Sequence, residues 1–218
     1  KFGAKNEDDE TEIPLSGLFI KCIGTERSKW ADMIIDYFQN FQLNQPKASE
    51  LKKDLSLAKD HLRILIEPGE NVKKFAVNCI TRKDFPGTYT FLALESGDFV
   101  HLVERDEIEW EASDDSLFRI ALDNVAKEKI IIKPLSLGKA FDYFAFFSFN
   151  SSAVFLIELA RNAPSALGKF GTIVAIPTSE AAFAYPINDI NKLNFPLIFE
   201  PFLADLYQMG QIPINKTF

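Results

Sequence analysis

Histidine and cysteine are scarce in this chain, and their scarcity limits the chemistry that it can carry. The 218 residues include two histidines, His61 and His101, and two cysteines, Cys22 and Cys79. A zinc site needs three or four converging ligands, so we expect no metal centre. Each histidine stands in a run of alternating apolar residues, which indicates a structural role. A chain of this length does not need a disulfide, so buried free thiols are expected, with one disulfide as the alternative.

The sequence also lacks the short motifs of common catalytic and nucleotide-binding sites. No Gly-x-Gly-x-x-Gly, P-loop or Gly-x-Ser-x-Gly string occurs in it. Cys79 would act as a nucleophile only if the fold brought a histidine to it, and both residue types stand inside expected strands. Glu180, Asp189 and Glu200 are spread over C-terminal turns and helices, where single carboxylates usually serve as caps. We therefore expect no cofactor, and the sequence leaves catalytic residues unassigned.

Basic residues are in the minority. Lys and Arg number 24 against 31 Asp and Glu, which gives a net charge of −7. Nucleic-acid affinity comes mainly from neutralising phosphates with Lys and Arg, and anionic membranes attract the same residues. The most apolar stretch, 141–160, is interrupted by Asp142 and Glu158, unlike a membrane-spanning helix. We expect a soluble protein that binds no nucleic acid and does not insert into membranes.

Acidic residues gather in two places. Residues 1–12 form an acidic lead-in that we expect to be flexible, and seven acidic side chains lie between Glu104 and Asp115 beside Arg105 alone. This second segment is predicted to be a solvent-facing edge that suits a basic protein partner. Trp110 within it has two interpretations: a core anchor, which we favour, or an exposed hot spot ringed by charge. The candidate interaction residues are Glu104, Asp106, Glu107, Glu109, Trp110 and Glu111.

Apolar periodicity predicts one α+β domain over residues 13–218, with a mainly antiparallel sheet packed with several amphipathic helices. Helices are expected over 26–41, from 113 to about 125, over 150–161 and over 197–209, with a weaker one near 51–58. Strands are expected over 15–23, 61–67, 75–80, 88–94, 99–103, 141–149, 172–176 and 181–185. The runs 88–94 and 99–103 flank Ser96-Gly97 and predict a hairpin.

Phenylalanine is abundant, with 21 residues in the chain and twelve of them after position 140. Large rings bury much apolar area, so the C-terminal third is expected to supply the densest part of the core. An exposed aromatic binding surface is the alternative. The residues expected in the core include Trp30, Phe38, Phe144, Phe146, Phe155 and Phe202.

The order of the C-terminal elements carries a family resemblance. Residues 141–147 read FDYFAFF and lead into Asn150-Ser151-Ser152 and an apolar helix; GTIVAIP follows at 171–177 with Glu180 in its turn. Over roughly the last 130 residues this pattern resembles the YtpQ-like family of uncharacterised bacterial proteins. That family tends to place Asp residues where this chain has Ser151-Ser152 and Glu180. The resemblance implies a fold and no activity.

Two functions stay open at this point. The lack of motifs favours a non-enzymatic bacterial interaction or regulatory protein that uses its acidic edge or an exposed part of its Phe-rich surface. The alternative is a hydrolase-like or small-ligand-binding protein whose site is assembled from scattered residues. A cytoplasmic location is expected, and export after removal of an N-terminal leader is the alternative, because the chain begins at Lys1.

Overall fold

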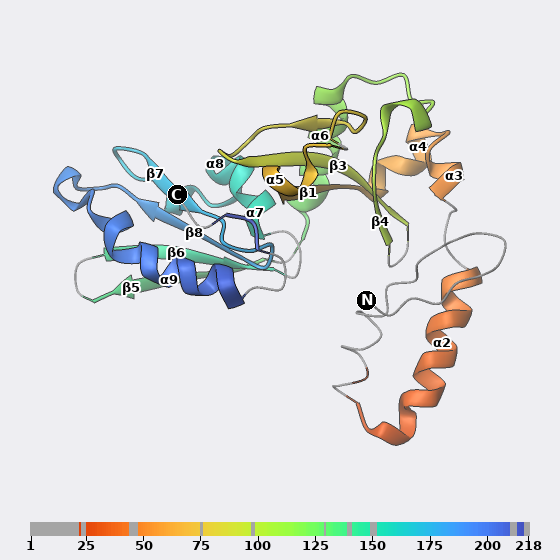
Figure 1. Ribbon diagram of the computed structural model, residues 1–218, viewed down its shortest axis with the longest axis horizontal. Helices are drawn as coiled ribbons and strands as arrows, with labels where there is room; N and C mark the ends of the chain where they lie inside the picture. The colour runs from red at the N-terminus through yellow and green to blue at the C-terminus, as the bar shows by residue number, and fades with distance from the viewer. Residues whose placement is uncertain are drawn as a thin grey trace.

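A computed structural model of the chain describes residues 22, 25–43, 48–74, 76–96, 99–128, 130–138, 141–148, 152–209 and 213–215. Two antiparallel sheets lie side by side with helices between and around them, so the fold is α+β, as predicted (Figure 1). The acidic lead-in, nearly all of the strand expected at 15–23, the cap residues Asn150 and Ser151, and the side chain of Phe38 lie outside the described residues.

The first sheet is built around one long strand, β3. It consists of β1 (Leu62–Pro68), β2 (Thr81–Arg82), β3 (Thr88–Ser96) and β4 (Phe99–Leu102). β3 pairs with β1 along one edge and with both β2 and β4 along the other. The predicted β3–β4 hairpin is therefore confirmed. The strand predicted at 75–80 is wrong, because residues 76–78 form a turn and Cys79 makes only an isolated bridge to Glu104.

The second sheet has the strand order β5-β6-β8-β7, with every pair antiparallel. Its strands are β5 (Ile131–Leu137), β6 (Phe141–Phe147), β7 (Thr172–Ala175) and β8 (Ala181–Pro186). The sequence pattern predicts three of these strands but not β5. Pro134 stands in the middle of β5, and Pro argues against a strand unless the strand lies at the edge of a sheet, where β5 is found.

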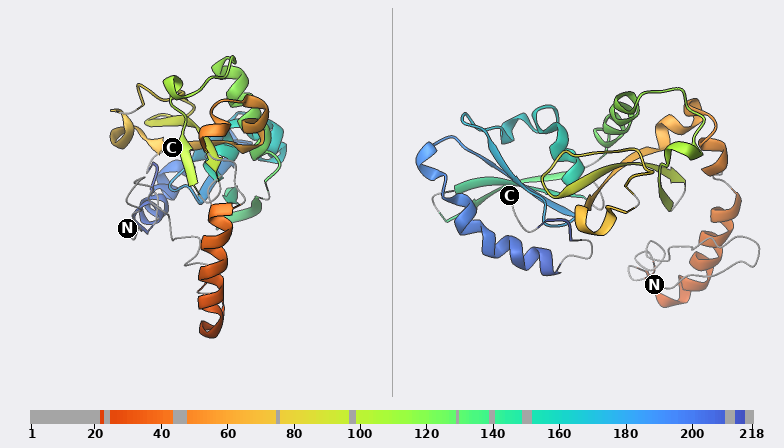
Figure 2. Two further views of the ribbon diagram at one scale, coloured as in Figure 1. Left: turned by 90° about the vertical axis from the view of Figure 1, so that its right-hand side faces the viewer. Right: turned by 45° about the horizontal axis from the view of Figure 1, so that its top comes forward.

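Helices between the two sheets join them into one hydrophobic core. They are α6 (Asp114–Val125) and a segment made of α7 (Ser152–Phe155), η4 (Leu156–Glu158) and α8 (Leu159–Asn162). The central cluster of buried residues takes Leu62 and Leu92 from the first sheet and Phe146 and Ala182 from the second. The single helix predicted at 150–161 is broken, because Glu158 leaves helical geometry with φ −113° and ψ 45°. Figure 2 shows the two sheets on either side of this helical layer.

The opposite face of the second sheet is covered by α9 (Phe195–Met209). Phe195 stacks on Tyr185, with ring centroids 4.1 Å apart, and Phe199 contacts Tyr143 edge to face at 5.0 Å. The Phe-rich C-terminal third therefore packs a dense core, as expected. Phe146 and Phe155 are buried as predicted and Phe144 is partly buried. The prediction of Phe202 in the core is wrong, because its side chain is 43% exposed.

The remaining helical pieces are short except for α2 (Trp30–Leu43), which continues η1 (Arg27–Lys29) and matches the predicted helix at 26–41. α2 extends away from both sheets in all views (Figures 1 and 2). Along its apolar stripe Tyr37 is buried, Trp30 is partly buried and Ile34 is exposed. The other pieces are α3 (Ala48–Leu51), α4 (Leu55–Ala58), η2 (Lys59–His61), α5 (Gly69–Val72), η3 (Arg105–Glu107), η5 (Pro164–Ala166) and η6 (Ile190–Lys192).

Candidate interaction surface

The acidic edge predicted at 104–115 holds its candidate carboxylates at the surface. Asp106, Glu107, Glu109 and Glu111 are exposed, and Glu104 is partly exposed. The backbone N–H of Glu109 donates to the carbonyl of Lys52 at 3.0 Å, which ties this segment to the end of α3. Lys52 also pairs with the Glu107 carboxylate. The sequence did not reveal this cation, because it comes from 55 residues earlier in the chain.

Trp110 does not belong to that surface. Its side chain is 8% exposed and packs in the central core. The indole N–H donates to the carbonyl of Leu51 at 2.9 Å, so the polar end of the ring is satisfied inside the molecule. The interpretation of Trp110 as a core anchor is confirmed, and its inclusion among the candidate interaction residues is corrected. The acidic edge thus has no exposed aromatic anchor at this position.

Cys79 lacks the electropositive setting that a reactive thiol needs. Cys22 and Cys79 are free thiols, as expected, with Cys22 buried and Cys79 only partly so. Burial raises the pKa of the Cys79 thiol, and the nearby carboxylates of Glu104 and Glu107 raise it further. A reactive cysteine needs the opposite shift. Burial, followed by the charge of Lys52, lowers the pKa of His101.

Of the three scattered carboxylates, Asp189 has a local structural role. Asp189 accepts a hydrogen bond from the backbone N–H of Asn191 at 3.0 Å and so caps η6, as its sequence position indicated. Glu200 is exposed on α9. In the part of the chain that the structure describes, no group of three or more His, Cys, Asp or Glu side chains is arranged to hold a metal ion.

A small pocket lies between β1, α7 and the turn that joins β7 to β8. Its volume is about 40 Å³, enough for a water-sized occupant and far below the roughly 300–1,000 Å³ of typical ligand pockets. Burial raises the pKa of the Glu67 carboxyl in its wall. The Ser179 hydroxyl is buried without a hydrogen-bond partner among the described residues. The lining residues are Leu65, Ile66, Glu67, Ala153, Val154, Ser179 and Ile214.

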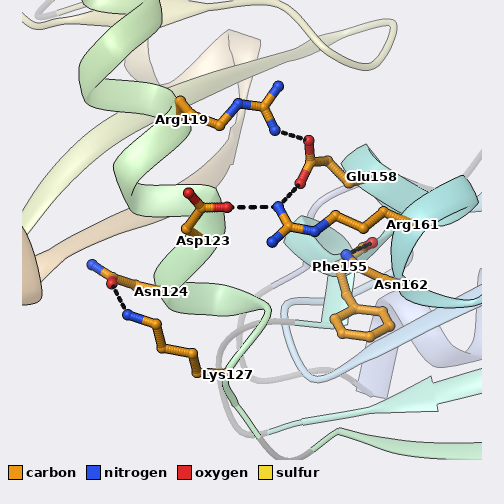
Figure 3. A network of polar contacts seen from close by, with 8 residues as sticks. All are labelled: Arg119, Asp123, Asn124, Lys127, Phe155, Glu158, Arg161 and Asn162. Carbon is orange, nitrogen blue, oxygen red and sulfur yellow. Dashed lines mark hydrogen bonds and ion pairs between the residues drawn. The ribbon is translucent and has the colours of Figure 1, made fainter.

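A network of ion pairs connects α6 to the helical segment that follows β6 (Figure 3). Glu158 pairs with Arg119 of α6 and, at 3.0 Å, with Arg161. Arg161 also contacts Asp123 of α6 at 2.6 Å and thereby lowers the pKa of that carboxyl. Every charge in this network has an opposite partner, so its geometry is that of a structural connection between helices. No local pattern indicates the network, because its two halves lie far apart in the chain.

α9 has large apolar side chains on its exposed side as well as on its buried side. Phe195, Phe199 and Leu203 recur at a spacing of four and are buried against the sheet. On the other side Leu197 is 76% exposed and Ile198 is 45% exposed. Among the described helices none is long and apolar enough to cross a membrane. We call the exposed side chains Leu197, Ile198, Pro201 and Phe202 the α9 face.

An uncovered apolar strip lies on the same side of the second sheet. Tyr143, which contacts α9, stands opposite Leu135 of β5, and directly opposed residues point to the same side of a sheet. The period of two places Ile131 and Phe147 on that side as well. Leu135, Ile131 and Phe147 are all exposed, Ile131 the most at 58%. α9 therefore leaves part of this apolar sheet face uncovered.

The charge on α9 has one sign. Glu200 and Asp205 are the charged residues of the helix, whose sequence contains no Lys or Arg, and both are exposed. Lys133 of β5 lies on the same side of the sheet as α9, with its amino group 5.9 Å from the Phe147 ring centroid. The surface thus combines large apolar side chains with two carboxylates on the helix itself.

Comparisons of this chain with protein-family models, with curated proteins and with solved structures found no match. The resemblance to the YtpQ-like family therefore stays a prediction.

Proposed function

We propose that this protein is a non-enzymatic interaction protein that binds its partner through the α9 face. One observation carries the proposal: α9 has large apolar side chains on its outer side as well as on its buried side. The outer side of a surface helix is normally polar, and contiguous exposed apolar surface usually belongs to an interaction site. Covering Leu197 and Ile198 would remove from water the side chains that the fold itself leaves uncovered.

The occupant that fits is another protein with basic groups. Two copies of this chain packed through their α9 faces would bring Glu200 and Asp205 of both copies together, and like charges across an interface oppose binding. A partner with Lys or Arg relieves that repulsion. The net charge of −7 and the exposed carboxylates of the acidic edge favour the same kind of partner, because they raise the rate of encounter with a cation.

A random-peptide library displayed on phage tests the proposal even though the partner is unidentified. Peptides selected on the full chain are retested on a variant with Leu197→Gln and Ile198→Gln, which keeps charge and largely keeps helix propensity. Leu57→Gln on α4 is the matched control, since Leu57 is 54% exposed on another helix. We expect selected peptides to bind the control normally and the α9 variant at least about ten-fold more weakly. Equal binding to all three proteins, or a failure to select any peptide, would contradict the proposal.

A further inference from the structure

The outward side chains of α9 form a row that suits one shape of partner. Leu197, Pro201 and Ala204 follow the spacing i, i+4, i+7 on the side opposite the buried Phe199. A helix of this length is about 22 Å long. Rows of this spacing pack against the rows of another helix. We infer that the α9 face takes a basic amphipathic helix of a partner protein, an inference that rests on the proposed function.

The charges on α9 specify where the partner's cations lie. At about 100° per residue, Glu200 falls on one side of the Leu197–Pro201 row and Asp205 on the other. A partner helix therefore carries Lys or Arg on both sides of its apolar stripe, as the flanking positions of paired helices do. An acidic or neutral helix would cover both carboxylates without giving either a cation, which is unfavourable.

Pro201 adds a hydrogen-bond acceptor to the same place. Proline has no backbone N–H, so the carbonyl of Leu197, four residues earlier, cannot receive its usual helical hydrogen bond. This carbonyl belongs to the most exposed apolar residue of the α9 face. A Lys or Arg side chain is a charged donor that can reach it, and such hydrogen bonds are stronger than neutral ones. The acceptor and the two carboxylates thus favour the same partner chemistry.

A labelled synthetic peptide with a helical repeat of Leu and Lys tests this inference by fluorescence anisotropy on the full chain. Its comparison peptides are one with Glu in place of every Lys and one with the same Leu/Lys composition in scrambled order. The test variant combines Glu200→Gln with Asp205→Asn. The matched control combines Glu109→Gln with Glu111→Gln on the acidic edge, so both variants lose two negative charges.

We expect the helical Leu/Lys peptide to bind more tightly than both comparison peptides. The α9 charge variant should bind this peptide with a Kd raised by about two- to five-fold per carboxylate removed. The acidic-edge variant should raise the Kd by less. Binding of the Glu peptide at equal affinity would overturn the basic character of the partner. Equal binding of the scrambled peptide would overturn its helical form, and a larger loss in the acidic-edge variant would place docking there.

The variant with Leu197→Gln and Ile198→Gln separates this inference from the proposed function. If that variant binds the helical peptide as well as the unmodified protein does, the α9 face is not the docking surface and both proposals fail. If it loses binding while the α9 charge variant does not, the proposed function stands and the basic-helix inference fails.

Discussion

α6 and α9 both bury one apolar side against a sheet, but their outer sides differ. α6 buries Leu117, Phe118 and Leu122 and presents polar residues outward, where Arg119 and Asp123 find partners in the following helical segment. α9 presents Leu197 and other large apolar side chains outward. The outward charged residues of α6 therefore find partners within the same chain. The outer side of α9 is left uncovered by the described part of the chain. This contrast is the observation on which the proposed partner surface on α9 rests.

The largest expected effects lie on the buried sides, where the two helices are alike. Phe118→Ala and Phe199→Ala should each lower the free energy of unfolding by about 3–5 kcal/mol, because each removes a fully buried ring. Urea titration followed by tryptophan fluorescence and by circular dichroism measures both. Trp110 belongs to the central cluster and Phe199 to the cluster beneath α9, so a Phe199→Ala shift seen by fluorescence also tests whether the two clusters unfold together. Unfolding transitions that differ between fluorescence and circular dichroism would show that the chain does not unfold as one cooperative domain.

Trp110 provides the next largest effect. Trp110→Phe keeps most of the buried ring but leaves the Leu51 carbonyl without its donor, so stability should fall by about 1–3 kcal/mol. Thermal and urea unfolding check this value. Peptide binding at the α9 face should not change. If Trp110→Phe left stability unchanged and reduced peptide binding, Trp110 would be an interaction residue and not a core anchor.

The polar side of α6 gives a smaller effect. Arg161→Met removes the contacts of Arg161 to Asp123 and Glu158, and the resulting loss of stability should shrink as salt screens the network. Arg161 lowers the pKa of Asp123 in the folded protein, so this part of the stability is present above the unfolded-state pKa and is lost as the pH falls through the folded-state pKa. Unfolding measured along a pH series should show that acid dependence weakened in Arg161→Met.

The smallest expected effect is at Glu67. Its contribution to stability changes with pH in the opposite direction to that of Asp123. Burial raises the pKa of Glu67, so the folded protein favours the protonated carboxyl. Stability is then higher below the unfolded-state pKa and falls as the pH rises through the raised folded-state pKa. Glu67→Gln should remove this decline and slightly stabilise the protein at neutral pH. An unchanged pH profile would mean that the carboxyl is solvated in solution.

Local patterns were predictable from the sequence, and long-range contacts were not. The Ser113 hydroxyl caps α6 by accepting from the backbone N–H of Ser116, as its position before two aspartates indicated. The alternating run at 61–67 predicted β1, in which every second residue is buried, and the apolar runs flanking Ser96-Gly97 predicted the β3–β4 hairpin. β5 was not predicted, because Pro134 argues against a strand unless that strand lies at a sheet edge. The residues of β5 do not themselves show that it lies at an edge.

The candidate site shows the same division. Exposure of the acidic edge followed from charge alone, since that many carboxylates cannot be buried without cations. The position of Trp110 depended on a carbonyl 59 residues away, which no local pattern contains. Phe202 was expected in the core because aromatic residues on helices usually are, yet it lies at the margin of the sheet contact: its ring contacts Phe183 and Phe199 while its side chain stays 43% exposed. The apolar excess of α9 is itself a sequence property, because counting the apolar residues on each side of a helix over 195–204 reveals it.

The most direct test of the central claim is one variant measured in two ways. Leu197→Gln should leave the free energy of unfolding within about 0.5 kcal/mol of the unmodified protein, because the residue is 76% exposed. The same substitution should raise the Kd for the helical Leu/Lys peptide by at least about ten-fold. Loss of stability with unchanged peptide binding would show that Leu197 is a structural residue and would contradict the account.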